Sequence, residues 1–392
     1  MRPDFVIFYR MKTKRVIDFF FHSVKIPSPS YRENKYRIFL EKKLEKLGAE
    51  IIVEKSEEGT NLIARFPSKF SNDWIGLSAH MDTVENGNEK ITPVLDGNMI
   101  WSSGETILGA DNKSTISMFF EAAKTIQENN IKHRPFEFLL TFGEEKHLTG
   151  ARLLNPEKFI SRKILLMDAS GKVGGIIESS PTHYSFKIIV KGKKAHAGIE
   201  PEKGKNAIKA AALIITSFPD GRISPTTTFN VGEIRGGGAT NIVPDEVVIE
   251  GEFRSTEKDQ IDEIVEQLMN LNLQFEDIKT DLVQDYLGYS LKKEDSFVKE
   301  IVQVIKKTGL TPHFTASGGG SDANIFREKG LNAVNLTSGM IEPHTYNECI
   351  AVDDLIKGTE IIINILSLSE PEKTRKKTVK KNYSIAPMCG WP

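Results

Sequence analysis

Short apolar segments alternate with helical segments over much of this chain. The segments Trp74–Ala79, Phe136–Phe142 and Ile164–Met167 are mostly apolar, and this pattern predicts strands that are buried on both faces. A helix is predicted over Ser114–Gln127, between the first two of these strands. Buried strands that alternate with helices are typical of an α/β fold with a mostly parallel sheet. We therefore predict an α/β domain as the main unit of the protein.

The pattern changes at about Thr182, where apolar residues begin to alternate with polar ones. Strands are predicted over Ser185–Lys191, Thr228–Arg235, Val247–Arg254 and the end of Leu273–Asp281, and helices over Asn206–Phe218 and Gln260–Leu271. This β-α-β-β-α-β order predicts a small antiparallel sheet with helices on one face. The first pattern then returns with a helix over Ser296–Lys307, a strand over Asn332–Leu336 and a helix over Val352–Leu368. We therefore predict a discontinuous main domain (11–180 and 290–370), an inserted domain (181–289) and a basic tail (371–392).

Composition excludes several classes of protein. The chain has 392 residues and a formal net charge of −1, so it has no overall field that would attract nucleic acid or an anionic membrane. The basic tail is interpreted as a solvated segment, with a tether to nucleic acid or membrane as the alternative. Cys349 and Cys389 are too few for a disulfide framework, and no apolar run is long enough to span a membrane. We predict a cytoplasmic protein without a nucleic-acid or membrane partner.

Residues that can bind a metal ion lie next to the ends of the predicted strands. They are His80, Asp111, Glu145, Asp168 and His344. Ligands bind at the carboxyl ends of the strands in α/β sheets, so we expect these residues to meet there. Two imidazoles and three carboxylates suit a pair of divalent ions, with Zn²⁺ favoured and Co²⁺ or Mn²⁺ as alternatives. Each residue alone also has a simpler interpretation, such as a hydrogen-bonded histidine at His80 or a helix cap at Asp111.

Further residues indicate how such a site would work. The adjacent carboxylates of Glu144 and Glu145 repel each other unless a cation holds them, so one can bind a metal while the other accepts a proton from water. Asp82 lies two residues after His80, a spacing at which a carboxylate can orient the imidazole. His196, in the inserted domain, is more typical of a structural histidine when it is taken alone. Across a cleft, however, it can donate a hydrogen bond to an oxyanion.

Eight short motifs follow one another along the chain. They are Ser78–Val84 (SAHMDTV), Gly109–Lys113 (GADNK), Gly143–Glu145 (GEE), Met167–Asp168, Ala195–Gly198 (AHAG), Thr240–Pro244 (TNIVP), Gly319–Asn324 (GGSDAN) and Pro343–His344. In this order they resemble the motifs of the M20 family of di-zinc peptidases, most closely its peptidase T-like (tripeptide aminopeptidase-like) branch. The resemblance extends over about residues 12–368.

This resemblance implies a fold and a role for each site residue. The fold would be a discontinuous α/β catalytic domain with a mixed sheet, interrupted by an α+β ferredoxin-like lid domain. His80 and Asp168 would bind one zinc ion, Glu145 and His344 the other, and Asp111 would bridge them. Glu144 would be the general base, Asp82 would orient His80, and Asn241 and Arg254 would contact the substrate. His196 would polarise the scissile carbonyl, from the partner subunit in dimeric members of the family.

The predicted activity is that of a metal-dependent exopeptidase acting on short peptides, by resemblance an aminopeptidase acting on tripeptides. A metal pair lowers the pKa of a bound water to about 7, and the resulting metal-bound hydroxide attacks the peptide. Glu144 would accept the proton of the water and deliver it to the leaving amine.

The sequence departs from the tripeptidase pattern at one position. Gly318 stands where those members tend to have an arginine that binds a substrate carboxylate, and Arg235 and Arg254 are the candidates to replace it. An N-acyl amino acid amidohydrolase or a dipeptidase of the same fold is therefore the alternative activity. An inactive relative that binds peptides is a further alternative. A monomer and a homodimer through the lid both stay open.

Overall fold

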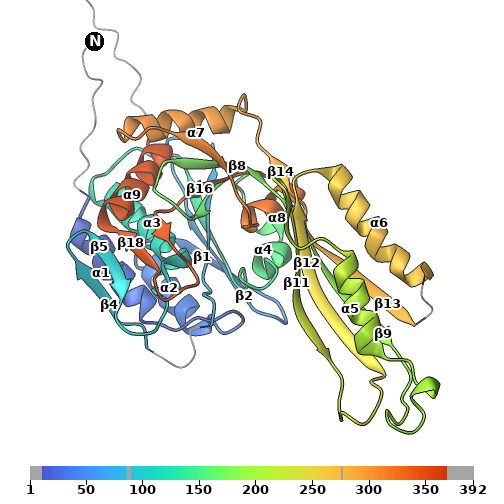
Figure 1. Cartoon of the computed structure of the whole chain (residues 1–392). Helices are drawn as coiled ribbons and strands as arrows, with labels where there is room; N and C mark the ends of the chain where they lie inside the picture. The colour runs from blue at the N-terminus through green and yellow to red at the C-terminus, as the bar shows by residue number, and fades with distance from the viewer. Residues whose placement is uncertain (1–10, 86–89, 275–276, 369–392) are drawn as a thin grey trace, which may run out of the picture.

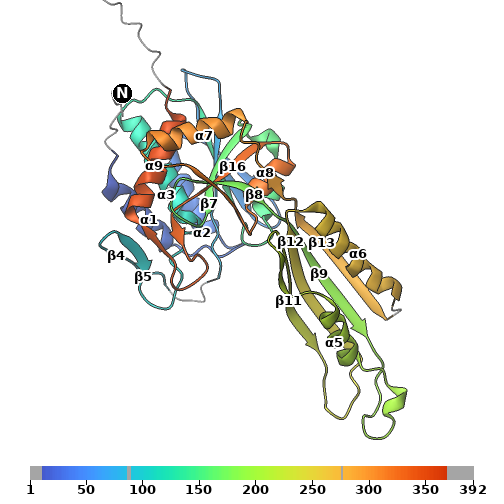
Figure 2. The same cartoon turned by 45° about the horizontal axis from the view of Figure 1, so that its top comes forward.

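The computed structural model describes residues 11–85, 90–274 and 277–368. A rounded body carries one long lobe, which extends away from the body in both views (Figures 1 and 2). The body holds a nine-stranded and a four-stranded sheet, and the lobe holds a five-stranded sheet. The strands of the lobe come from the middle of the chain, so two separate stretches of sequence form the body.

The nine-stranded sheet forms the centre of the body. Its strands are β1 (Glu50–Lys55), β2 (Thr60–Phe66), β3 (Ile75–His80), β6 (Phe136–Thr141), β7 (Lys163–Ala169), β8 (Gly175–Ser180), β14 (Tyr289–Ser290), β15 (His313–Ala316) and β16 (Asn332–Thr337). They lie in the order β1-β2-β6-β3-β7-β16-β8-β14, with β15 beside β8. β6, β3, β7 and β16 are parallel, whereas β1, β2 and β14 pair antiparallel with their neighbours. The predicted mixed sheet is confirmed, and its parallel strands end at one common edge.

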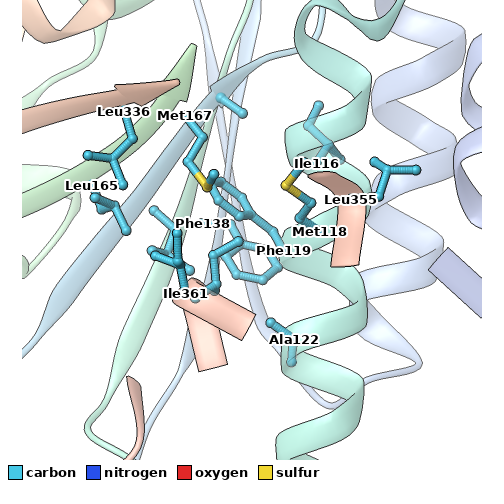
Figure 3. Packing of buried hydrophobic residues seen from close by; sticks show 14 of the residues in the cluster. Ile116, Met118, Phe119, Ala122, Phe138, Leu165, Met167, Leu336, Leu355 and Ile361 are labelled. Atoms are coloured by element: carbon cyan, nitrogen blue, oxygen red, sulfur yellow. The ribbon is translucent and has the colours of Figure 1, made fainter. Parts of the chain in front are cut away.

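Helices cover both faces of this sheet. α1 (Thr13–Val24), α2 (Asn34–Glu45), α3 (Ala110–Glu128), α7 (Ser296–Lys307) and α9 (Val352–Leu366) pack on one face, and α4 (Thr149–Leu153) and α8 (Asp322–Glu328) on the other. In β7, Met167 faces the first group and Leu166 the second, as the period of two in a strand requires. Figure 3 shows the first core, where the rings of Phe119 and Phe138 lie 5.4 Å apart. Burial on both faces explains why these strands are apolar throughout.

Local signals set the ends of two helices. The carboxylate of Asp295 accepts hydrogen bonds from the N–H groups of Phe297 and Val298 at 2.8 and 3.2 Å, so α7 begins after this cap, as predicted. α3 begins before the predicted Ser114, and its first turn is irregular. Gly109 has a φ of 74°, and Asp111 has a ψ of 107°, which is outside the helical region. The irregular turn therefore carries a candidate metal ligand.

The lobe has the ferredoxin-like arrangement expected of the lid. β10 (Gly221–Ser224), β11 (Thr227–Gly236), β12 (Glu246–Ser255), β9 (Thr182–Lys191) and β13 (Ile278–Tyr286) form one antiparallel sheet in that order. α5 (Ala207–Ser217) and α6 (Lys258–Gln274) pack on one face of it (Figure 2). The strand predicted at the end of Leu273–Asp281 is β13, which begins at Ile278 and continues to Tyr286. The short strand β10 was not predicted. An α/β body with an α+β lid is nevertheless confirmed.

The four-stranded sheet lies beside the main sheet. It consists of β4 (Pro93–Asp96), β5 (Met99–Ser102), β17 (Met340–Ile341) and β18 (Cys349–Ala351). His344 lies in the loop between β17 and β18, so the short strand β17 stands between it and β16, the predicted strand that it follows. Over the described residues, no helix combines the length and the apolar character needed to cross a membrane. The predicted basic tail, residues 371–392, lies outside the described residues.

Candidate metal centre

The five candidate metal ligands meet at the carboxyl edge of the parallel strands. His80 is the last residue of β3, and Asp168 is the next-to-last residue of β7. Glu145 lies in the turn after β6, and Asp111 lies in the irregular first turn of α3. His344 arrives from the loop between β17 and β18. Five separate segments of the chain thus supply one cluster.

The contacts in this cluster fall into two sets. Nε2 of His80 lies 3.0 Å from Oδ1 of Asp111 and 3.3 Å from Oδ1 of Asp168. Nε2 of His344 lies 2.9 Å from Oε1 of Glu145 and 3.3 Å from Oδ2 of Asp111. Asp111 belongs to both sets and offers a different oxygen to each imidazole. This is the arrangement that a bridging carboxylate requires.

Electrostatics favour cations at this position. Burial raises the pKa of Asp168 to about 6, and the carboxylates of Asp111 and Glu145 add to this effect. Burial and the Asp111 carboxylate likewise raise the pKa of Glu145, although the His344 contact opposes the shift. Hydrogen bonds with Asp111 and Glu145 raise the pKa of His344 to about 10. Carboxylates this close together repel each other without a positive partner, so the donor set fits divalent metal ions.

Neighbouring amides fix the position of Asp168. Nδ2 of Asn112 donates to Oδ1 of Asp168 at 2.5 Å, and the N–H of Asp168 donates to Oδ1 of Asn335 at 2.9 Å. Both asparagines are buried. No local sequence pattern indicates either contact, because the three residues come from distant parts of the chain.

Asp82 lies against His80, the residue it is predicted to orient, and it also contacts the turn after β6. Nδ1 of His80 lies 3.0 Å from the carbonyl oxygen of Asp82 but 3.4 Å from its carboxylate oxygen Oδ1. The carboxylate instead accepts hydrogen bonds from the N–H groups of Glu144 and Glu145, at 3.0 and 3.1 Å, and from Oγ of Ser30 at 2.8 Å. Asp82 therefore connects His80 to the turn that carries both glutamates.

A second buried carboxylate holds the same turn. Oε1 of Glu33 accepts hydrogen bonds from the N–H groups of Tyr31 and Gly143, at 2.8 and 3.0 Å. Gly143 has a φ of 57°, and a Cβ added there would lie 3.0 Å from the ring of Tyr31. Glycine is thus required at this position both by the backbone conformation and by the close approach of the ring.

Glu144, the candidate general base, follows Gly143 in this turn. Burial raises the pKa of Glu144 well above its usual range; His80 opposes this shift, and Asp168 and Glu145 reinforce it. Asp322, in the GGSDAN motif, is a further buried carboxyl group near these residues. Its Oδ2 accepts a hydrogen bond from Oγ1 of Thr141 at 2.5 Å, and burial raises its pKa to about 7. The motif is evident in the sequence, but the contact of Asp322 with Thr141 follows only from the fold.

Charged residues join the near end of the lid to the body. Asp285 of β13 lies 3.0 Å from Nδ1 of His147, in the body, and 3.3 Å from Nδ1 of His183, in β9. Nε2 of His183 lies 2.9 Å from Glu252, whose two oxygens also bind the guanidinium of Arg254, each at 3.0 Å. Hydrogen bonds from His183 and Arg254 lower the pKa of Glu252 to about 2.

The three candidate residues of the lid lie at opposite ends of its sheet. Arg254 is at the near end, and its Nη1 donates to the carbonyl of Gly318 at 3.3 Å. His196 and Asn241 are exposed at the far end, beyond the pairing of Lys191 with Glu246. β9 spans 10 residues between these ends, about 30 Å at the usual rise per residue. Within one chain, the structure therefore does not bring His196 or Asn241 to the cluster.

Two sequence profiles match parts of the chain. The M20 peptidase dimerisation domain matches residues 181–273, which is most of the lid. Peptidase family M28 matches residues 61–209, a range that contains His80, Asp111, Glu145 and Asp168.

Similar proteins match nearly the whole chain. An aminopeptidase PepT structure from Bacillus cereus is 36% identical with a TM-score of 0.82, and covers 91% of this chain and 98% of that one. A tripeptidase structure from Staphylococcus aureus is 30% identical with a TM-score of 0.86, and covers the same shares, 91% and 98%. The uncharacterized protein YqjE of Bacillus subtilis is 35% identical over 366 residues, 90% of this chain and 98% of that protein.

Proposed function

This chain belongs to the peptidase T-like branch of the M20 peptidase family, and we propose that it is an aminopeptidase that acts on tripeptides. It is a metal-dependent exopeptidase that hydrolyses short peptides. The observation that carries the proposal is the position of Asp111 between His80 and His344, with Glu144 in the adjoining turn. A carboxylate between two imidazoles suits a pair of metal ions, and a free carboxylate beside them suits a general base.

The five ligands divide into two sets by their contacts. His80 and Asp168 would bind one metal ion, His344 and Glu145 the other, and Asp111 both. Zn²⁺ is the proposed metal, because imidazole and carboxylate ligands together suit it, and Co²⁺ and Mn²⁺ are the alternatives. Bound metal ions supply Lewis acidity and bring the pKa of a bound water to about 7.

Glu144 is the proposed general base. It lies in the turn that carries the candidate ligand Glu145 and is not itself one of the five ligands, so its carboxylate is available to accept a proton. The carboxylate would accept a proton from water, and the resulting carboxyl group would donate that proton to the amine of the leaving residue. Asp82 binds the backbone N–H of Glu144, so a buried group fixes the position of the base.

The lid supplies the proposed substrate contacts. Arg254 lies beside Gly318, where its guanidinium would bind the substrate carboxylate in place of the missing arginine. Asn241 and His196 would act in a homodimer formed through the lid, an arrangement supported by the match to a peptidase dimerisation domain. There, His196 of the partner subunit would donate a hydrogen bond to the developing oxyanion.

An N-acyl amino acid amidohydrolase or a dipeptidase is the second candidate. Gly318 supports this second candidate, because the arginine expected at this position in tripeptidases is missing. These enzymes would use the same metal ligands and the same base. They differ in the substrate groups that the lid binds.

Metal content and substrate length together test the proposal. Purified protein is analysed for bound metals, and hydrolysis of an unblocked tripeptide is measured before chelation, after it, and after Zn²⁺ or Co²⁺ is added back. We expect two ions per chain and activity that falls and returns. Dipeptides and N-acetylated amino acids are the comparison substrates. Turnover of either one in place of the tripeptide would support the second candidate, and absence of both metal and hydrolysis would refute both.

A further inference from the structure

Glu348 is a buried carboxylate outside the candidate ligands and base. It is 1% exposed and lies in the loop between β17 and β18, four residues after His344. A buried carboxylate is costly unless hydrogen bonds satisfy its oxygens. Its hydrogen-bond partners therefore show which part of the structure it stabilises.

Three backbone N–H groups around the first turn of α3 donate to this one carboxylate. The N–H groups of Leu108 and Gly109 lie 2.8 and 2.7 Å from Oε2, and the N–H of Asp111 lies 3.0 Å from Oε1. The first N–H groups of a helix have no partners within the helix. Glu348 supplies acceptors for them and so stabilises the irregular turn.

The same loop also reaches the side chain of Asp111. Nε2 of His344 lies 3.3 Å from Oδ2 of Asp111, and Glu348 binds the backbone N–H of that residue. Directly after Glu348 the chain enters β18, which pairs with β5 and whose Ile350 is fully buried. One short loop, anchored in a sheet, therefore holds Asp111 at its backbone and at one carboxylate oxygen. The other oxygen faces His80 at 3.0 Å.

We propose that Glu348 is a positioning residue that fixes the backbone of Asp111, so that its two carboxylate oxygens face His80 and His344. This inference rests on the proposed function, because it takes Asp111 as the ligand shared by both metal ions. Changes to residues that orient metal ligands typically weaken metal binding about 10- to 100-fold. We expect a loss of this size when Glu348 is replaced.

Glu137 provides a matched control for a purely structural role. It too is fully buried and accepts hydrogen bonds from the N–H groups of Ile160 and Ser161, both at 2.9 Å, and it also pairs with Arg65. It lies near the amino end of β6, at the edge of the sheet opposite the cluster. Loss of its charge should destabilise the fold without reaching the metal centre.

The experiment compares the full-length variants Glu348→Gln and Glu137→Gln with the wild type. The amide of glutamine keeps one acceptor oxygen, but its NH₂ group faces a backbone donor that the carboxylate satisfied. Metal-free protein is titrated with Co²⁺ alone, and the visible absorption of the bound ion and its affinity are recorded. Hydrogen exchange of the Leu108, Gly109 and Asp111 amides is measured on the metal-free proteins, and thermal unfolding monitors the fold.

We expect Glu348→Gln to bind Co²⁺ about 10- to 100-fold more weakly, with an altered spectrum and faster exchange of these amides. Glu137→Gln should keep the wild-type affinity and spectrum, whatever its thermal stability. Wild-type Co²⁺ binding by Glu348→Gln, or an equal loss in both variants, would overturn the role of Glu348 and leave the proposed function standing. Failure of the wild type to bind Co²⁺ would instead refute the proposed function, and the exchange rates would still decide whether Glu348 holds the turn.

Discussion

His80 and His196 are both candidate active-site histidines, yet their surroundings differ sharply. His80 is 1% exposed at the end of a buried strand, and carboxylates and backbone groups surround its ring. His196 is exposed in a loop beyond the far end of the lid sheet. Its ring nitrogen Nδ1 accepts a hydrogen bond from the N–H of Gly198, only two residues away.

The surroundings of His80 and His196 differ because the two residues have different proposed roles. Metal ligands must be held in a fixed geometry, and buried side chains such as Asp82, Glu33 and Glu348 provide this by binding the backbone of the turns that carry them. A residue that meets the substrate from a second chain has to stay exposed until the complex forms. In the proposed mechanism, all five metal ligands come from one chain, whereas His196 would come from a partner subunit.

The largest expected effect is at the cluster, in the variant Glu144→Gln. Glutamine cannot accept the proton of the water, so we expect hydrolysis to fall about 10²- to 10⁴-fold. Metal content should stay at the wild-type value, because Glu144 is not among the five ligands. Steady-state hydrolysis of a tripeptide and metal analysis of the same sample check this. Activity within a few-fold of the wild type would remove Glu144 from the role of base.

His196→Ala tests the proposed hydrogen bond from His196 to the oxyanion. Loss of an oxyanion contact should lower kcat about 10²- to 10³-fold while metal content stays unchanged. Co-expression of His196→Ala with Glu144→Gln then tests whether the histidine comes from a partner chain. A mixed dimer has one site with both residues intact, so part of the activity should return. If the mixture stays inactive while each variant forms dimers, the contact is not made between chains.

Continuous patterns in the sequence account for the parts of the fold that could be predicted. β3, β6 and β7 are buried on both faces and so appear as apolar runs, and the helical spacing of apolar residues over Ser296–Lys307 predicts α7. β17 and β18 have 2 and 3 residues, too few to show a period of two. Their sheet, and with it the approach of His344, therefore could not be predicted.

In the candidate site too, only features with a local sequence pattern could be predicted. His80, Asp111, Glu145 and Asp168 could be grouped because each lies next to a predicted strand or helix end, and His344 because its segment follows the predicted strand Asn332–Leu336. Glu33 and Glu348 bind backbone N–H groups that are 110 and 237–240 residues away in the sequence. No local pattern indicates such a contact, so only the fold reveals which carboxylates hold the turns.

Arg254→Lys tests whether Arg254, at the near end of the lid, binds the substrate carboxylate. Lysine cannot reproduce the paired contacts of a guanidinium with a carboxylate, so KM for a tripeptide should rise about 10-fold or more. Arg235→Lys is the matched control, because Arg235 is exposed and pairs with Glu233 and Glu250, away from Gly318. A tripeptide amide, which lacks the carboxylate, should show little change in KM with Arg254→Lys. An equal rise for both substrates would mean that Arg254 does not bind the carboxylate.

The smallest effect is expected from Glu252→Gln. This variant tests whether the negative charge of Glu252 holds His183 and Arg254 at the near end of the lid. His183 and Arg254 lower the pKa of Glu252 to about 2, so its ionised form stabilises the fold above its unfolded pKa of about 4.5. This contribution is lost as the pH falls from about 4.5 towards 2. Because 37% of the side chain is exposed, solvent screens the ion pairs, and we expect about 1 kcal/mol.

Thermal unfolding of the wild type and of Glu252→Gln at several pH values measures this contribution. At neutral pH the variant should unfold about 2–4 °C lower than the wild type, and the gap should narrow as the pH falls below about 4.5. Asp285 keeps its contacts with His147 and His183 in both proteins, so its own titration cancels in the difference. A gap that does not change with pH would mean that the hydrogen-bonding shape of Glu252, and not its charge, holds His183 and Arg254 at the near end of the lid.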